Sequence, residues 1–416
     1  MKHATARCNR SVLSTLIGAA LAALVAPAQA QTISDDVVKI GVLTDMGGPN
    51  SDFSGQGSVE AARLAIEEVG GSVRGKKIEL ISSDHQNKAD IASATARRWY
   101  DAEKVDMITD LVGSPNSLAV VELGKQLKRV TMVTGGYSSR LTNDACSPYN
   151  VHYQIDTVAL SSTPRLLTQR GAGTWFFVTA DYAFGRSMEK DATAAIEEAK
   201  GKVIGGVKHP FNNPDFSSFM LQAQASGAKM VALANAGGDM INSVKSANEF
   251  GLTRSDKQSV MAMAFLITDV HALGLEMAQS LYTIEGFYWD MDEQTREFAQ
   301  RYYKRMNKMP SAIQAATYSA TLTYLKAIEA TGSDDAAAVM KQMQSTPVND
   351  VYARNATIRK DGRLLKDLYL VQVKKPAEST KPWDYYHIRA TVPAEEAFQP
   401  LSKSTCPGIA APAAAN

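Results

Sequence analysis

Two stretches of the chain decide its fold because they repeat the same unit. The first is KIGVLTDMGGPNSDFSGQGSVEAARLAIEE (residues 39–68), and the second is WFFVTADYAFGRSMEKDATAAIEE (residues 175–198). Each begins with an apolar, β-rich run, continues through a loop that contains a phenylalanine, and finishes in a helical pattern ending Ala-Ile-Glu-Glu. A glycine and another β-rich run follow in both cases. Strand–helix–strand units of this kind build parallel sheets covered by helices.

Further β-rich runs alternate with helical patterns in both halves of the chain. They are residues 38–43, 77–82, 106–111 and 130–134, and then 174–179, 203–207, 229–234 and 259–264. Several are continuous apolar runs, which is typical of strands covered on both faces. The sequence therefore predicts an α/β fold with two doubly wound parallel-sheet lobes. Sheets of this type bind ligands at the carboxyl ends of their strands, so we expect a cleft between the lobes.

The later part of the chain does not read as a third domain. Two long helical patterns, about residues 294–307 and 314–331, are followed by short β-rich runs such as 368–373. We expect the chain to cross between lobes near residues 146–149, 285 and 356, which makes a three-crossing hinge that permits closure. The expected division is 37–152 plus 286–356 for lobe 1 and 153–285 plus 357–395 for lobe 2. The Pro/Ala-rich segment 402–416 is expected to be a flexible tail.

The first 30 residues have the pattern of a secretory signal peptide. Lys2, Arg7 and Arg10 precede an apolar run at residues 12–25, and Ala-Gln-Ala at residues 28–30 offers a cleavage site. The apolar run is too short for a membrane span, although an uncleaved signal anchor is the alternative. We therefore expect export to the periplasm.

Two cysteines, Cys146 and Cys406, remain after removal of residues 1–30. An oxidising compartment favours a disulfide between them, which would attach the C-terminal segment to the body. The alternative is two separate buried thiols.

Composition limits the class of protein. Hydrophobic residues make up 45% and charged residues 21% of the chain, as in ordinary globular proteins. About 385 residues remain after the signal peptide, enough for two domains. The formal net charge is +1 and no basic block stands out, which argues against a nucleic-acid partner.

Catalytic signatures are missing from the sequence. It contains no G-x-S-x-G elbow, P-loop or H-E-x-x-H motif. Gly55-Gln56-Gly57 lacks the third glycine of a dinucleotide fingerprint and follows a long loop rather than a strand end. Asp269 and His271 supply fewer ligands than a zinc site needs. We therefore predict a protein that is not an enzyme and that uses no cofactor or metal.

Loops of the first lobe carry small polar residues that suit anion binding. Gly113 and Ser114 follow one predicted strand, and Gly136, Tyr137 and Ser138 follow the next. Helix N-termini present free N–H groups and a partial positive charge, and they hold carboxylates readily. The alternative interpretation is that Ser114 and Ser138 are ordinary N-caps.

Three further loops contribute apolar and aromatic residues. Phe53 follows Gly47-Gly48-Pro49 in the first lobe, Tyr182 and Phe184 follow a strand of the second lobe, and Asn235-Ala236 follow another. Aromatic side chains at a cleft provide apolar area and can stack on a ring. Ordinary packing at the edge of a core is the alternative.

The chain resembles a known family. The opening residues 39–49, the turn Asp181-Tyr182-Ala183-Phe184-Gly185 and the pair Asp215-Phe216 after a proline are similar to periplasmic binding proteins of the leucine/isoleucine/valine type, which are type I receptors of ABC importers. The resemblance implies that hydroxyls and amides of Gly113-Ser114 and Gly136 to Ser138 hold a ligand carboxylate. It also implies that Phe53, Phe184 and Tyr182 contact the rest of the ligand.

Departures from the family pattern bear on the ligand. Ala264 stands where the amino-acid binders place an acidic residue for the ligand ammonium, and Ala236 stands where they often place a tyrosine. A buried ammonium without a counter-charge is costly. The chain is similar in this respect to the branch that binds aromatic carboxylates, with Phe53, Tyr137, Tyr182 and Phe184 available to line a ring. Asp239 or Asp269 would serve an ammonium in a shifted register, which keeps a branched-chain or other amino acid as the alternative.

The sequence thus predicts a monomeric periplasmic receptor that closes two lobes around a small carboxylate and delivers it to an inner-membrane ABC permease. Two hypotheses from other classes remain open at this point. One is a ligand-sensing domain for a membrane receptor, and the other is a secreted α/β enzyme.

Overall fold

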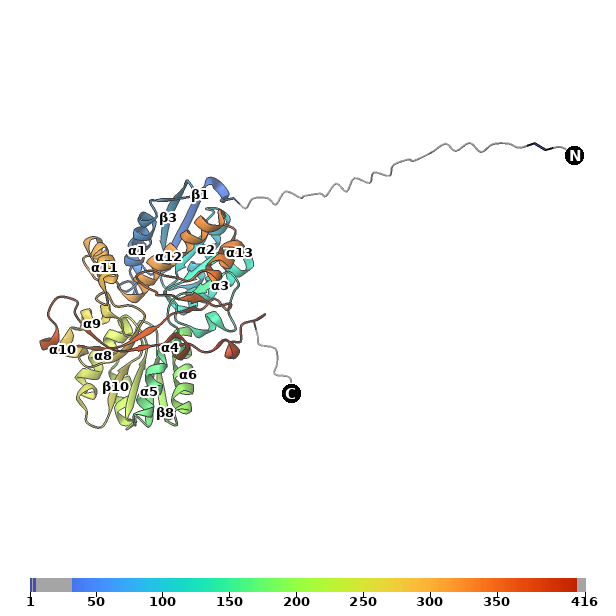
Figure 1. Cartoon of the computed structure of the whole chain (residues 1–416). Coiled ribbons are helices and arrows are strands. Elements are labelled where there is room, and N and C mark those ends of the chain that lie inside the picture. The colour runs from blue at the N-terminus through green and yellow to red at the C-terminus, as the bar shows by residue number, and fades with distance from the viewer. Residues whose placement is uncertain (2, 5–31, 410–416) are drawn as a thin grey trace. The chain divides into compact units, whose positions relative to one another are not determined.

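A computed structural model describes residues 1, 3–4 and 32–409 (Figure 1). The predicted signal peptide lies almost wholly outside the described residues, as do residues 410–416 of the predicted tail. The described residues from 32 onward belong to one compact unit. Within the described part of the chain, no helix combines the length and the hydropathy that a membrane span requires.

The first sheet has six strands in the order β2-β3-β1-β4-β5-β6. All neighbouring strands are parallel except β2 and β3. The strands are β1 (Val37–Thr44), β2 (Ser72–Val73), β3 (Lys76–Asp84), β4 (Met107–Asp110), β5 (Val130–Val133) and β6 (Asn150–His152). Their covering helices include α1 (Gly55–Glu68), α2 (Ala89–Asp101) and α3 (Ser114–Leu127). The strand order reverses between β3-β1 and β4-β5, which is the point where such sheets bind ligands.

The second sheet has four parallel strands in the order β10-β9-β7-β8. They are β7 (Thr174–Ala180), β8 (Lys202–His209), β9 (Met230–Ala234) and β10 (Ser259–Ala262). The helices around it are α4 (Thr157–Leu160), α5 (Ser162–Gln169), α6 (Ala183–Glu198), α7 (Ser217–Ala225), α8 (Gly238–Glu249), α9 (Ile267–Leu273) and α10 (Leu275–Ala278). The predicted two-sheet α/β fold is confirmed by these two parallel sheets and their helices.

A three-stranded antiparallel sheet, in the order β11-β14-β15, lies beside the second sheet (Figure 1). It pairs β11 (Tyr282–Glu285) with β14 (Leu368–Val373), and β14 with β15 (Tyr386–Val392). Between β11 and β14 the chain returns to the first sheet and forms α11 (Glu293–Met306), α12 (Ala312–Thr331), α13 (Ala336–Ser345) and the hairpin β12 (Thr357–Ile358) with β13 (Leu364–Leu365). After β15 come α14 (Ala394–Ala397) and a short 3₁₀ turn, Leu401–Lys403.

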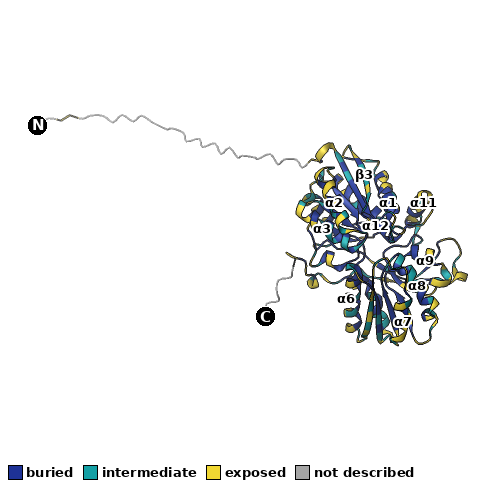
Figure 2. Cartoon of the chain, turned by 180° about the vertical axis from the view of Figure 1, so that it is seen from behind, coloured by how far each residue is buried: buried dark blue, intermediate teal, exposed yellow. Residues whose placement is uncertain are grey.

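Burial follows this layering. The strands of both parallel sheets are mostly buried, and the helices that cover them have both buried and exposed residues (Figure 2). Helix α12 is buried along most of its length, as its continuous apolar and small residues require. Its N-cap, Ser311, donates a hydrogen bond of 2.6 Å to the carbonyl oxygen of Phe53. Gln314, three residues on, donates to the carbonyls of Asp52 and Ser54. The start of α12 therefore holds the loop that carries Phe53.

The C-terminal segment is attached to the first sheet. Cys146 and Cys406 form a disulfide with a Cα–Cα distance of 5.6 Å. Nearby, the Ser404 hydroxyl donates a 2.8 Å hydrogen bond to the carbonyl of Thr142. Of the predicted flexible tail, residues 402–406 are thus bound to the body, and only residues 407–416 lie beyond this attachment.

Candidate functional site

A small cavity lies where loops from the two parallel sheets meet. Loops that follow β1, β4 and β5 contribute one side, and loops that follow β7 and β9 contribute the other. Its lining residues are Asn50, Phe53, Val112, Gly113, Ser114, Gly135, Tyr137, Tyr182, Phe184 and Ala236. Every contributing loop comes from the carboxyl end of a parallel strand, which is where sheets of this type bind ligands. The cavity therefore has the position of a ligand site.

The N-terminus of α3 faces this cavity. The N-cap residue is Gly113, at φ 87°, a conformation that favours glycine, and no side chain caps the helix. Ser114 is therefore not an N-cap. Its side chain is 1% exposed, and its hydroxyl oxygen has no hydrogen-bond partner among the described residues. Buried hydroxyls are normally hydrogen-bonded, so this group at a helix N-terminus is available to an anion.

Asp110 holds the loop after β5 against the loop after β4, which carries Gly113 and Ser114. The Asp110 carboxylate accepts from the amide of Val112 at 3.0 Å and from the hydroxyl of Ser54 at 2.9 Å. Its carbonyl accepts from the amide of Gly135 at 2.8 Å, and a Cβ on Gly135 would lie only 2.6 Å from the Asp110 carboxylate. Burial raises the pKa of Asp110 to about 6. Sequence reasoning missed this positioning residue, because a carboxylate at a strand end carries no distinguishing pattern.

Aromatic side chains from both sheets fill the cleft. The ring centroids of Tyr137 and Phe184 are 5.7 Å apart, and those of Tyr182 and Phe184 are 5.8 Å apart. Phe53 is buried beside them. The remaining cavity volume is about 20 Å³, room for about one water molecule, whereas a cavity of about 150 Å³ accepts benzene. A ring-sized ligand therefore enters only when the lobes separate or when one of these rings moves.

Not every predicted site residue lines the cavity. Of the predicted set, Phe53, Gly113, Ser114, Tyr137, Tyr182, Phe184 and Ala236 do. Gly136 and Ser138 flank Tyr137 without lining it. The Gly136 carbonyl accepts from His152 Nε2 at 2.6 Å, and the Ser138 hydroxyl lies 2.9 Å from that of Ser187.

Asn235 and Ala264 are buried outside the cavity lining. The Asn235 side chain faces His209 and Ser243, to which its amide nitrogen lies at 3.2 and 3.3 Å. Its carbonyl oxygen has no partner. In this structure, neither Asn235 nor Ala264 is placed to contact a ligand in the cavity.

The two acids considered for an ammonium also lie outside the lining. Asp239 accepts hydrogen bonds from the amides of Asn212 and Asn213 at 3.0 and 2.7 Å. Asp269 accepts from the amide of Leu266 at 2.9 Å, and burial raises its pKa to about 8. Each carboxylate is thus already used to hold a loop or a helix start. Over the residues that the structure describes, no group of three or more His, Cys, Asp or Glu side chains is placed to hold a metal ion.

Hydrogen bonds link the two sides around the cavity. The amide of Gly238 donates to the carbonyl of Pro49 at 3.2 Å. On another side, the Ser139 hydroxyl donates to the Asp191 carboxylate at 2.8 Å, next to the contact between Ser138 and Ser187. The loops after β1 and β5 are thereby joined to helices α8 and α6. The loops of the first lobe are therefore in direct contact with helices of the second lobe around the site.

Comparison with known proteins agrees with this architecture. The family model described as periplasmic binding protein matches residues 37–380. A periplasmic binding protein from Burkholderia mallei is 46% identical, with a TM-score of 0.87 over 89% of this chain and 99% of that one. A branched chain amino acid ABC transporter periplasmic ligand-binding protein from Burkholderia xenovorans LB400 is 40% identical, with a TM-score of 0.81 over 89% of this chain and 100% of that one.

A more distant solved structure shares the fold alone. It is a solute binding protein of an ABC transporter from Rhodopseudomonas palustris BisB5 in complex with 3,4-dihydroxy benzoic acid, 21% identical, with a TM-score of 0.76 over 86% of this chain and 98% of that one. The two more similar structures and a family match over most of the chain agree with the paired parallel sheets. The chain belongs to the periplasmic binding protein family.

Proposed function

We propose that the protein is the periplasmic solute-binding receptor of an ABC importer and that it captures a small aromatic carboxylate. The observation that carries the proposal is the buried Ser114 hydroxyl, which has no partner at the N-terminus of α3 and faces the cleft. The N-terminal signal peptide would direct export and would then be removed. The receptor would act as a monomer and hand its ligand, chemically unchanged, to an inner-membrane permease.

The carboxylate is assigned to the first-sheet side of the cleft. Ser114 offers a hydroxyl, and among the described residues the amide nitrogens of Ser114 and Tyr137, which line the cavity, donate no hydrogen bond to a protein group. The same holds for the amides of Gly136 and Ser138, which flank Tyr137 outside the lining. Amides and a hydroxyl directed at one anion form charge-assisted hydrogen bonds, which are stronger than neutral ones. The partial positive charge at the start of α3 adds to this attraction.

The absence of a counter-charge in the lining disfavours a zwitterionic amino acid. None of the ten lining residues carries a charged side chain. An ammonium brought into this cavity would lose its hydration without gaining a carboxylate, which is unfavourable. Asp239 and Asp269, the two acids nearest in sequence to the predicted positions, already accept backbone hydrogen bonds elsewhere.

The rest of the ligand would contact aromatic side chains. Phe53 and Tyr137 come from the first-sheet side, and Tyr182 and Phe184 come from the second. Offset or tilted aromatic contacts add to the gain from burial of apolar area, so a ring suits this lining better than a short aliphatic chain. Because the aromatic residues come from both sides, ring binding and lobe closure would be linked. The same fold holds an aromatic acid in the Rhodopseudomonas palustris protein.

A thermal-shift panel tests the ligand class. Benzoate, 4-hydroxybenzoate and cinnamate are compared with leucine, valine and a mixture of aliphatic acids at equal concentration. A ligand that binds only the native state raises the melting temperature, and at equal concentration a tighter ligand raises it more. We expect a rise with the aromatic acids and none with leucine or valine. A rise with the amino acids alone would contradict the aromatic assignment and favour the branched-chain alternative.

A further inference from the structure

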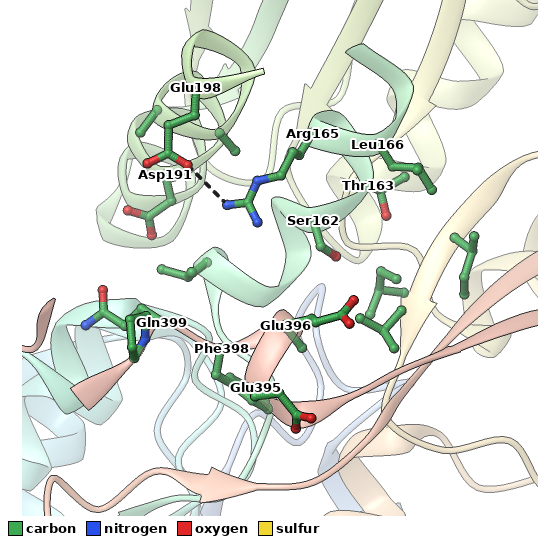
Figure 3. Close-up of a pocket in the computed structure, with 18 of the residues that line it drawn as sticks. Ser162, Thr163, Arg165, Leu166, Asp191, Glu198, Glu395, Glu396, Phe398 and Gln399 are labelled. Carbon is green, nitrogen blue, oxygen red and sulfur yellow. Dashed lines mark ion pairs between the residues drawn. The ribbon is translucent and has the colours of Figure 1, made fainter. Parts of the chain in front are cut away.

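A second and larger cavity lies away from the cleft. Its volume is about 650 Å³, within the range of about 300–1,000 Å³ that is typical of small-molecule sites. Helices α5 and α6 form one wall, and α14 with residues 398–403 forms the opposite wall (Figure 3). Strands β11, β14 and β15 contribute Ile284, Leu370 and Val392. None of its lining residues also lines the cleft cavity.

The lining combines an apolar surface with an excess of carboxylates. Its apolar members include Val158, Leu166, Ile284, Leu370, Val392 and Phe398. Its charged members are the acids Asp191, Glu198, Glu395 and Glu396 and the bases Arg165 and Lys403. The acids outnumber the bases by two. The cavity thus presents a negative, partly apolar surface.

The two bases are already directed at one carboxylate. Arg165 lies 3.5 Å and Lys403 3.8 Å from the carboxylate oxygens of Glu198. Glu395 and Glu396, on the opposite wall, have no cation within 4.0 Å among the described residues. Asp191 also has no cation partner among the described residues, but its carboxylate accepts hydrogen bonds from Ser139 and Thr157. The exposed carboxylates of Glu395 and Glu396 therefore remain as the acids of the cavity that are not engaged by a cation.

A buried hydroxyl points to an occupant. Thr163, on α5, is 2% exposed, and within the described part of the chain its hydroxyl oxygen has no hydrogen-bond partner. Figure 3 shows this hydroxyl directed into the space between the two walls. Its neighbour Ser162 differs, because the Ser162 hydroxyl donates to the carbonyl of Ala159 at 2.7 Å. An unpartnered buried hydroxyl is uncommon, and a donor group on a ligand would satisfy it.

We propose that this cavity is a second binding site, specific for a small organic cation with an apolar body. The ammonium group faces Glu395 and Glu396 and can donate to the Thr163 hydroxyl. The apolar body lies against the strand residues and Phe398. The proposal concerns a site separate from the cleft, so it does not depend on the identity of the carboxylate ligand.

Isothermal titration with n-hexylammonium tests the site, because this probe has one positive charge and an apolar chain. The variants are the pair Glu395→Gln and Glu396→Gln, and separately Thr163→Val. The matched control is the pair Glu249→Gln and Glu276→Gln, two exposed acids outside the cavity. We expect saturable binding that weakens about fivefold or more in the first pair and about threefold in Thr163→Val. The control pair should bind like the original protein.

Two further probes of the same chain length, one anionic and one neutral, distinguish the contribution of charge to binding from that of apolar contact. We expect n-hexanoate and n-hexanol to bind at least about tenfold more weakly than n-hexylammonium. Three results would overturn the proposal: no saturable heat with n-hexylammonium, an equal loss in the control pair, or binding of n-hexanoate or n-hexanol that is as tight as that of n-hexylammonium. Binding of an aromatic acid in the cleft should persist in all variants, which reports on folding independently.

Discussion

The Ser138 hydroxyl oxygen lies 2.9 Å from the Ser187 hydroxyl oxygen, and this contact joins the loop after β5 to helix α6. Beside it, the Ser139 hydroxyl donates to Asp191 at 2.8 Å. The segment that presents its free amides to the proposed carboxylate is therefore the same segment that contacts the opposite lobe. Ligand capture and closure share one short stretch of chain.

Replacement of Ser187 tests whether this contact stabilises the closed form. Ser187→Ala removes a hydrogen bond between the lobes without touching the cavity, so affinity for an aromatic acid should fall by about 0.5–1.5 kcal/mol. The fall should arise from faster ligand dissociation, measured by stopped-flow fluorescence. Ser218→Ala, at an exposed serine of the same lobe, is the control and should have no effect. The double variant Ser138→Ala with Ser187→Ala should lose no more affinity than the single variant with the larger loss. Additive losses of affinity would argue against a contact shared by the two serines.

Replacement of Ser114 tests the proposed carboxylate site. Ser114→Ala removes the unpartnered hydroxyl at the start of α3, and affinity for an aromatic acid should fall by about 1–3 kcal/mol because a charge-assisted hydrogen bond is lost. Ser246→Ala is a matched control, since its hydroxyl is also buried and unpartnered but lies outside the cavity lining. Calorimetry compares the two. Equal affinity in Ser114→Ala and the original protein would remove Ser114 from the site.

Asp269 predicts a pH dependence of stability. Burial raises its pKa from the ordinary 3.8 to about 8, so the folded state holds this proton more tightly than the unfolded state does. Its contribution to stability is therefore fully present below about pH 4 and is lost as the pH rises to about 8. Asp269→Asn cannot ionise, and it should reduce the loss of unfolding free energy between pH 5 and pH 8.5 by about 1–3 kcal/mol.

Urea unfolding at the two pH values measures this difference. Asp256→Asn, at an exposed position, is the control and should leave the pH dependence unchanged. The same pH dependence in Asp269→Asn as in the original protein would contradict the assignment.

The disulfide predicts a large effect on stability. Cys146 and Cys406 are separated by 260 residues, so the bond restricts the unfolded chain strongly. Replacement of both cysteines by alanine should lower the free energy of unfolding by about 2–5 kcal/mol in urea titrations. Reduction of the original protein should shift its urea midpoint to the same place. Coincident unfolding curves with and without reductant would contradict the predicted contribution of the bond to stability.

The fold was largely predictable because its signals are local. The strand at Thr174–Ala180 is a mostly apolar run, the strand at Val37–Thr44 is interrupted by a charge only at Lys39, and α12 follows a capping serine at Ser311. The antiparallel sheet was not predicted. Its pairing of Tyr282–Glu285 with residues 369–372 joins segments more than 80 residues apart, and sequence periodicity contains no information on such a register.

The residues of the candidate site were predictable only where their position just after a strand fixes their place at the edge of the sheet. Ser114 and Phe184 follow strands directly, and parallel strands bring such residues to one edge. Asn235 also follows a strand, but its side chain turns toward His209 inside the lobe. Side-chain direction within a loop depends on tertiary contacts. Ser138 illustrates the same limit, since no sequence pattern connects it to Ser187.

One titration tests the central claim most directly: calorimetry of the purified mature protein with benzoate and, separately, with leucine. The cavity offers free amides and a hydroxyl to a carboxylate but no charge to an ammonium. We therefore predict saturable benzoate binding that is at least about 100-fold tighter than leucine binding, a difference of about 2.7 kcal/mol. Leucine binding tighter than benzoate would contradict the account.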